Sequence, residues 1–282
     1  TDSMFQGTYH GKTKHQPDLD QVLLRATQHK ITKICITVGQ EEDFETALKI
    51  AKENNIYLTI GIHPTCAEKC TPEAIQKIEC ILKQNLSQVI MYGEFGLDYE
   101  RFQFASKESQ IAAFKKQLQL AHKYNLPLFL HCRAAYVDLT NIIMEYQRQN
   151  NTLFKGVVHS FDGSQQDLEL VLATPFLIGI NGCSLKTEDN LNVLKQIPLI
   201  KILTESDCPW CDIRPTHAGY KYVKTHFEQV KPEKYTLGKM VKSRNEISGV
   251  VQVEEVIAGV HQIEVEELRK IIENNSKTFL SW

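Results

Sequence analysis

Seven short apolar runs, separated by segments with helical periodicity, constrain the fold of this 282-residue chain more than any other feature. The runs are rich in β-branched residues: ITKICITVG (31–39), IYLTIGIHP (56–64), VIMYGEFG (89–96), LPLFLHCR (126–133), GVVHSFDG (156–163), FLIGING (176–182) and IKILTESD (200–207). Most are continuously apolar rather than alternating, which is typical of strands in a parallel sheet whose two faces are both covered.

Segments with helical periodicity lie between and after these runs. Five have apolar residues at helical spacing: residues 41–55, 71–85, 108–125, 250–260 and 264–282. Thr71 stands in N-cap position before the second of them, and Pro72 follows in the first turn. The alternation of strands with helices predicts βαβ units and therefore an α/β fold.

Seven strands are one fewer than a (β/α)8 barrel contains. Residues 1–30 read as a loop followed by a helix, so we expect the first barrel strand to precede Thr1. We predict a TIM (β/α)8-type barrel whose first strand is missing from this chain, with an open doubly wound sheet of seven strands as the alternative. No linker is visible, and we expect one domain over residues 1–282.

Composition excludes several classes of protein. No apolar run approaches the roughly 18 to 20 residues that span a bilayer, so we expect no membrane partner. The net charge of −2 is unlike that of proteins that coat nucleic acid, which are usually basic. Eight scattered cysteines suit a reducing compartment, the cytoplasm or the nucleus. Cys208 and Cys211 form a C-x-x-C pair, so redox chemistry or structural zinc is an alternative.

Polar side chains stand at the carboxyl ends of four of the runs. Side chains two residues apart on a strand share a face. This alternation groups Tyr92 with Glu94, Phe129 with His131, Val157 with His159, and Leu203 with Glu205 and Asp207. In parallel barrels the active site is assembled from the carboxyl ends of several strands. We therefore expect Glu94, His131, His159 and Asp207 to converge.

Two histidines and two carboxylates are a common ligand set for Zn²⁺, Mn²⁺ or Mg²⁺. Each residue alone has a structural explanation: a histidine after a strand can be a hydrogen-bonded core residue, and Glu94 can cap a turn. Four such residues at four strand ends favour a metal site.

Several sequence blocks resemble those of the TatD family of metal-dependent deoxyribonucleases, especially its eukaryotic branch. The blocks are YGEFGLDYER, LPLFLHCR, VVHSFDGS, IGINGCSLKT, LTESDCPWC and SRNE. Their order and spacing match along essentially the whole chain. The resemblance implies a TIM-barrel hydrolase with a centre of one or two divalent metals at the barrel mouth, Mg²⁺ or Mn²⁺ in use and Zn²⁺ as an alternative.

The resemblance also implies roles for individual residues. Glu94 would bridge or bind metal, His131 and His159 would be ligands, and Asp207 would bind metal and hold the attacking water. His63, in GIHP, would contact the substrate phosphate. Two departures stand out. We expect the family's first-strand D-x-H or H-x-H ligand pair to precede Thr1, and RNEI (244–247) replaces the usual R-N-E-P.

Further roles follow from the chemistry of phosphodiester hydrolysis, which needs charge neutralisation and an activated water. Arg133 could donate to non-bridging oxygens, or it could form a salt bridge to Glu94 or Glu205. Glu205 either holds a metal ligand in place or supports neighbouring histidine and arginine side chains. Trp210 either stacks on a terminal base or packs over the barrel mouth.

Family resemblance implies a deoxyribonuclease, acting 3′ to 5′ on single strands or DNA ends, linked to DNA repair or DNA fragmentation. We expect a monomer. Two alternatives use the same fold: an amide or ester hydrolase, such as an aminoacyl-tRNA deacylase, and a barrel that has lost activity and serves as a binding scaffold.

Overall fold

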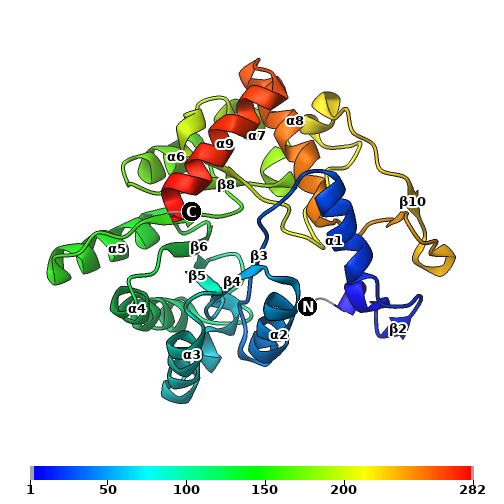
Figure 1. Ribbon diagram of the computed structural model, residues 1–282. Coiled ribbons are helices and arrows are strands. Elements are labelled where there is room, and N and C mark those ends of the chain that lie inside the picture. The colour runs from blue at the N-terminus through cyan, green and yellow to red at the C-terminus, as the bar shows by residue number, and fades with distance from the viewer. Residues whose placement is uncertain (1–2, 281–282) are drawn as a thin grey trace. The chain divides into compact units, whose positions relative to one another are not determined.

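The computed structural model describes residues 3–280 of the chain (Figure 1). The chain divides into two compact units. Unit 1 comprises Thr1–Thr32, Ser160–Asp162 and Gly179–Asn275, and unit 2 comprises Lys33–His159, Gly163–Ile178 and Ser276–Trp282. Within the described part of the chain, no helix is both long and apolar enough to cross a membrane.

Seven strands form one sheet in the sequential order β3-β4-β5-β6-β7-β8-β9. They are β3 (Cys35–Ile36), β4 (Tyr57–Ile60), β5 (Val89–Asp98), β6 (Leu128–Arg133), β7 (Gly156–Val158), β8 (Leu177–Ile180) and β9 (Ile202–Thr204). The pairs from β3 to β8 are parallel. Sequential parallel strands are the order of a (β/α)8 barrel, whereas a doubly wound sheet reverses its order. The predicted fold class is confirmed.

The strands are shorter than the apolar runs that predict them. β7 ends at Val158 and β9 at Thr204, so His159 and Asp207 lie beyond the strands. Asp207 has a φ of 49°, and the strand alternation does not extend to it. The register of β5 against β6 also shifts between Tyr92 and Phe95, which includes Glu94. The alternation argument is therefore wrong at Asp207 and Glu94, because a turn and a register shift interrupt it.

Helices of unit 2 follow its strands. They are α2 (Phe44–Asn54), α3 (Pro72–Asn85), α4 (Lys107–Lys123), α5 (Tyr136–Asn150) and α6 (Gln165–Leu172). The periodicity at 41–55, 71–85 and 108–125 correctly predicts the first three. The Thr71 hydroxyl accepts a hydrogen bond from the Ala74 backbone N–H at 3.2 Å, which confirms the predicted N-cap of α3.

Unit 1 has a 3-10 helix at Ser3–Gln6, followed by a short hairpin of β1 (Thr8–Tyr9) and β2 (Lys12–Thr13), where the sequence predicted only a loop. Its helices include α1 (Leu19–Gln28), α7 (Glu188–Leu194) and α8 (Val250–His261), and α9 (Val265–Leu280) begins in it. The predicted helices at 250–260 and 264–282 are confirmed up to residue 280, the last residue described. The polar segment 208–246 is mostly irregular, with a small parallel pair of β10 (Gln229–Val230) and β11 (Met240–Val241).

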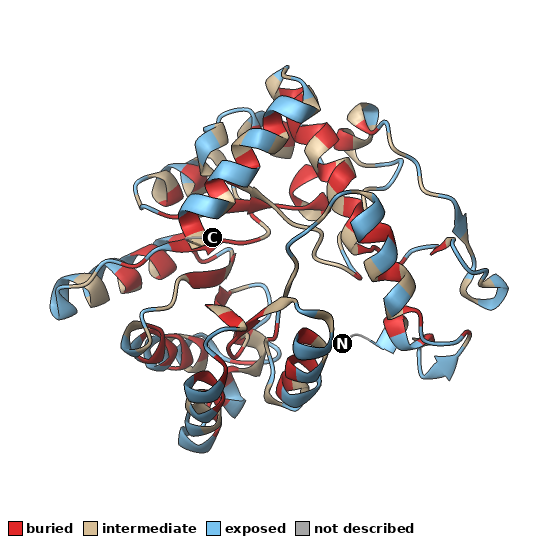
Figure 2. Ribbon diagram, in the orientation of Figure 1, coloured by how far each residue is buried: buried red, intermediate tan, exposed pale blue. Residues whose placement is uncertain are grey.

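Buried residues concentrate on the strands and on one side of most helices (Figure 2). Unit 1 also buries charged groups. The Arg244 guanidinium donates to both carboxylate oxygens of Asp18 at 2.6 and 2.7 Å and to Glu246 at 2.8 Å. Arg25 donates to the two oxygens of the same Glu246 at 2.7 and 3.0 Å. The SRNE block thus supplies two members of a buried arginine–carboxylate network.

Candidate metal centre

Three histidines and one glutamate from consecutive strands of the sheet meet in unit 2. Glu94 lies within β5 and His131 within β6, while His159 directly follows β7. His63 follows β4 and is the N-cap of the 3-10 turn Pro64–Lys69. The topology explains the convergence, since carboxyl ends of neighbouring parallel strands lie at one edge of a sheet.

Glu94 Oε1 stands at the centre of this cluster. It lies 2.6 Å from His159 Nε2, 2.8 Å from His131 Nδ1 and 3.6 Å from His63 Nε2. The nitrogens are also close to one another: His131 Nδ1 is 3.3 Å from His63 Nε2 and 3.4 Å from His159 Nε2. All four side chains are largely shielded, with 5% of His159 and 22% of His63 exposed at the extremes.

Hydrogen bonds at the far sides of the rings indicate different tautomers for His131 and His63. His131 Nε2 donates to Asp98 Oδ2 at 3.1 Å, which leaves the lone pair of Nδ1 facing the cluster when the ring is neutral. Nδ1 of His63 accepts from the Thr65 backbone N–H at 3.2 Å, so its proton is on Nε2. In its neutral form His131 therefore presents the lone pair of Nδ1 to the cluster, as a metal ligand would, whereas His63 presents the N–H of Nε2 as a hydrogen-bond donor.

The surrounding histidines favour the ionised form of Glu94. Burial alone would raise the pKa of Glu94, but the charges of His159 and His63 and hydrogen bonds from His131 and His159 hold that pKa well below its ordinary value. Burial lowers the pKa of His63 to about 4, so this ring is neutral near pH 7. Burial opposes the charge of His131 as well, yet its hydrogen bonds to Asp98 and Glu94 raise its pKa.

Gly96 allows the two central strands to approach closely. It pairs with His131 in the register of β5 and β6. A Cβ at this position would lie 1.9 Å from the His131 carbonyl oxygen, and the φ of Gly96 is +151°. Only glycine fits here, which explains the second glycine of GEFG and fixes His131 relative to Glu94.

Two buried glutamines of α4 hold the strand ends that carry the cluster. The Gln117 amide accepts from the Ile62 N–H at 2.7 Å and donates to the Ile62 carbonyl at 3.0 Å, next to His63. Gln110 bonds the N–H and carbonyl of Asp98 in the same way, at 2.7 and 2.9 Å. The helix thereby satisfies backbone groups at irregular strand ends and sets the positions of His63 and Asp98.

These residues fit a divalent metal. Glu94, His131 and His63 have potential ligand atoms that all lie within 4.8 Å of one another, and His63 could join the set only if Nε2 gave up its proton. The donors are imidazole nitrogens and a carboxylate oxygen, the set used for Zn²⁺ and Mn²⁺. The Asp98–His131 contact is the carboxylate–histidine arrangement that orients metal-binding imidazoles in many proteins.

Three other predicted site residues, Asp207, Glu205 and Arg133, bond to groups outside the histidine cluster. Asp207 and Glu205 belong to unit 1, where Asp207 Oδ2 accepts from the Cys211 thiol at 3.1 Å and Glu205 Oε2 accepts from the Ser160 N–H at 3.1 Å. Arg133 is in unit 2 and forms an ion pair with Glu100 at 2.7 Å. The metal role of Asp207 and the substrate role of Arg133 stay predictions.

The spacing of the C-x-x-C motif suggests that Cys208 and Cys211 lie together, but the sulfur next to Cys211 is that of Cys183. Cys211 Sγ lies 2.7 Å from Cys183 Sγ, and both cysteines are free thiols, as is Cys208. Burial raises the pKa of the Cys208 thiol to about 11, which disfavours it as a nucleophile.

The side chain of Trp210, for which the sequence suggested either base stacking or packing, is 57% exposed. Both of its suggested roles stay predictions.

Sequence reasoning missed Asp98, Gln110, Gln117 and Thr65. Asp98 stands four residues after Glu94 in YGEFGLD, inside a block that the prediction already used. The two glutamines are seven residues apart, so both lie on the buried face of α4. The two glutamines stand on the otherwise apolar face of the predicted helix. Because buried polar groups need hydrogen-bond partners, this placement could have indicated that they bond to neighbouring backbone groups.

Comparisons with known proteins give a consistent result. The family described as TatD related DNase matches residues 8–281. The chain is 39% identical to "Deoxyribonuclease Tat-D" of Schizosaccharomyces pombe, over 100% of this chain and 93% of that protein. It is 33% identical to the "3'-5' ssDNA/RNA exonuclease TatD" of Erwinia amylovora, over 72% and 79%. A crystal structure of a hydrolase TatD family protein from Entamoeba histolytica superposes with a TM-score of 0.94 and 36% identity, covering 99% and 94%.

Proposed function

The chain belongs to the family of TatD-related DNases, and on this basis we propose that it is a metal-dependent deoxyribonuclease. In this proposal the chain hydrolyses the phosphodiester bonds of DNA, and a bound divalent metal would supply the activated water. The observation that carries the proposal is the convergence of His159 and His131 on Glu94 Oε1, at 2.6 and 2.8 Å. Buried carboxylates surrounded by imidazole nitrogens are typical of metal centres.

Four residues hold the metal in this proposal: Glu94, His131, His159 and Asp207. A bound divalent cation supplies neutralisation of the phosphate charge and a water of lowered pKa. Asp207 would orient the attacking water and would be the group that takes up its proton. Glu205 keeps the segment around Asp207 in place through its bond to the Ser160 backbone. Mg²⁺ or Mn²⁺ is the ion in use, with Zn²⁺ as the alternative, and the site holds one or two ions.

His63 and Arg133 bind the phosphate in this proposal. The proton of His63 is on Nε2, which faces the cluster, and the ring is neutral near pH 7. A neutral N–H donor can bond a non-bridging oxygen without competing for the metal. The Arg133 guanidinium, 41% exposed and paired with Glu100, can exchange that carboxylate for a phosphate in the same fork geometry.

The substrate is DNA, degraded from the 3′ end of single strands or duplex ends, in keeping with the activity named for the bacterial relative. Such an enzyme removes ends during DNA repair or fragmentation, and we propose that it acts as a monomer in the cytoplasm or nucleus. The net charge of −2 favours an enzyme that binds ends over one that tracks along DNA.

The test is hydrolysis of a 5′-labelled single-stranded oligonucleotide in the presence of Mg²⁺, Mn²⁺ or Zn²⁺. The wild type should produce a ladder that shortens from the 3′ end, and Glu94→Gln or Asp207→Asn should lose it. The matched control is Glu79→Gln, a carboxylate on α3 that pairs with Lys83 and Lys123. It should keep full activity.

Other outcomes separate the alternatives. Cleavage of an amide or ester panel without hydrolysis of the oligonucleotide would assign the centre to a different hydrolase. A protein that neither binds metal nor turns over either class of substrate would be a scaffold. If Glu94→Gln were as active as the wild type, the assignment of the metal centre to Glu94 and its neighbouring histidines would be wrong.

A further inference from the structure

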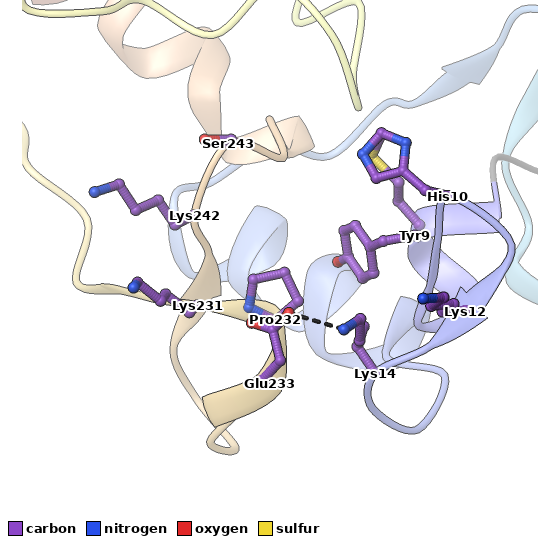
Figure 3. A pocket seen from close by; sticks show the side chains of 10 residues that line it. Tyr9, His10, Lys12, Lys14, Lys231, Pro232, Glu233, Lys242 and Ser243 are labelled. Atoms are coloured by element: carbon purple, nitrogen blue, oxygen red, sulfur yellow. Dashed lines mark ion pairs between the residues drawn. The ribbon is translucent and has the colours of Figure 1, made fainter.

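A basic pocket of about 660 Å³ lies in unit 1, between the N-terminal hairpin and residues 231–243 (Figure 3). Its lining includes four lysines, a histidine, a tyrosine and a single carboxylate. Tyr9, His10, Lys12 and Lys14 come from the hairpin side, and Lys231 and Lys242 come from the other side. The volume is within the roughly 300–1,000 Å³ typical of ligand sites.

The hairpin turn presents two of these groups. Tyr9 pairs with Lys12, and the two residues between them, His10 and Gly11, have φ values of 50° and 74°. Two left-handed residues in a two-residue loop are the type I′ turn, whose twist suits the adjoining strands. The turn leaves His10 and Lys12 exposed to solvent.

Positive charge in the pocket is only partly neutralised. The carboxylate of Glu233 pairs with Lys14 at 3.0 Å, the contact drawn in Figure 3. Within residues 3–280, Lys12, Lys231 and Lys242 form no ion pair, and all three are exposed. The whole chain has a net charge of −2, so this local excess of cations runs against the overall balance.

The two sides of the pocket are held together beneath it. Arg244 donates to the Met4 carbonyl at 3.1 Å as well as to Asp18, which ties the N-terminal segment to the chain after Lys242. The Tyr9 hydroxyl donates to His15 Nε2 at 3.0 Å, and the His15 ring stacks on Tyr235 at 4.4 Å. A pocket with fixed walls loses little conformational entropy when a ligand binds.

We propose that this pocket binds the phosphodiester backbone of a single-stranded nucleic acid, at a site additional to the candidate metal centre. The proposal rests on the proposed nuclease function. Lys12, Lys231 and Lys242 contact phosphates, because compact ammonium groups bind phosphate as point charges. The Tyr9 ring lines the wall as a surface on which a base can stack. Burial raises the pKa of Tyr9 to about 12, so its phenol adds no negative charge.

The test measures binding of metal-free protein to a fluorescein-labelled oligothymidylate of about 20 nucleotides, longer than the roughly 4–16 that one domain covers. The variant Lys12→Glu/Lys231→Glu/Lys242→Glu removes the three unpaired charges of the pocket. The control Lys195→Glu/Lys224→Glu/Lys270→Glu changes three exposed lysines of unit 1 that do not line the pocket, for the same change in net charge. Thermal unfolding checks that both variants fold.

The pocket variant should bind at least about 10-fold more weakly than the control at physiological salt. Its plot of log affinity against log salt should be less steep by about 2, since each phosphate contact on a single strand contributes about 0.7. Hydrolysis of a small diester, bis(p-nitrophenyl) phosphate, should be equal in both variants, while KM for the oligonucleotide rises in the pocket variant.

Equal binding by the two variants overturns the proposal. It is also overturned if the pocket lysines affect binding to phosphatidylserine vesicles but not to the oligonucleotide. Failure of the nuclease proposal is separate: the metal-loaded wild type would then hydrolyse no phosphodiester, whatever the metal-free binding assay gives.

Discussion

The two units bury charged side chains in opposite ways. In unit 1, Asp18 and Glu246 are neutralised by Arg244 and Arg25, and the side chains of this network are at most 9% exposed. In unit 2, Glu94 faces three imidazoles, and Asp98 holds the far side of one of them. Both arrangements satisfy the rule that buried carboxylates need partners, but with partners of different chemistry.

The difference distinguishes a network of permanent charges from the candidate metal centre. Arginine keeps its charge at every accessible pH, and its fork fits a carboxylate with two parallel hydrogen bonds. Histidine changes charge near pH 6.5 and can turn a lone pair toward a metal. The network of Arg244 therefore fixes backbone segments, whereas the cluster of Glu94 can exchange protons for a cation.

The first prediction breaks the arginine network. Arg244→Met should lower the free energy of unfolding by about 3–5 kcal/mol, because Asp18 and Glu246 remain buried with too few positive partners. Urea unfolding followed by circular dichroism measures the change. The control Lys221→Met removes an exposed ion pair to Glu188 and should leave the unfolding midpoint unchanged. Similar midpoints for the two variants would show that the buried network is not structural.

The second prediction removes the central carboxylate of the histidine cluster. Glu94→Gln should weaken binding of Mn²⁺ or Zn²⁺ by more than 100-fold, beyond the roughly 10–100-fold cost of losing an outer partner. Titration calorimetry measures the affinity. Metal at about 100 times its dissociation constant should raise the free energy of unfolding of the wild type by about 2.7 kcal/mol, and chelation should reverse this. Metal affinity equal to that of Glu79→Gln would contradict the assignment.

The sequence predicted the fold and the convergence of Glu94, His131 and His159 for the same reason. Continuous apolar runs identify buried parallel strands, and the order of such strands places their carboxyl ends together. Glu94, His131 and His159 follow from that order, although the alternation used for Glu94 fails at a register shift. Whether residues 1–282 form a single domain stays a prediction.

Other features depend on contacts between distant residues that no local pattern encodes. Asp98 and Gln110 are 12 positions apart, and Arg25 and Glu246 are 221 apart. The arginine network joins α1 to the SRNE block. No local sequence pattern indicates which carboxylate pairs with which arginine. The basic pocket depends on the same long-range closure, since Lys14 and Glu233 face each other only in the folded unit.

The third prediction keeps the proposed metal ligands and removes the carboxylate that orients one of them, His131. Asp98→Asn should weaken metal binding by about 10–100-fold, because His131 loses the carboxylate that holds its proton on Nε2. Nitrogen-15 NMR of the imidazoles should show His131 shift toward the other tautomer. The control Asp138→Asn changes a carboxylate bonded to Tyr99 and Lys107 and should alter neither quantity. If the tautomer of His131 changed but the metal affinity did not, Asp98 would orient the ring without contributing to metal binding.

The last and smallest effect concerns pH, to which the two clusters should respond differently. The pKa of His131 is raised in the folded protein, so its protonated form contributes stability below the ordinary histidine value near 6.5. That contribution is lost as pH rises through the raised pKa. The arginine network contains no histidine, the side chain whose ordinary pKa lies in this range.

The measurement compares metal-free wild type with Asp98→Asn from acidic to alkaline pH at constant ionic strength. Hydrogen bonding to Asp98 is a main cause of the raised pKa, so the stability difference between the two proteins should be largest at acidic pH and shrink as pH rises. Metal affinity should change in the opposite direction, since His131 must lose its proton before it binds a cation. A stability difference that is independent of pH would mean that Asp98 and His131 form a purely structural pair, like Asp18 and Arg244.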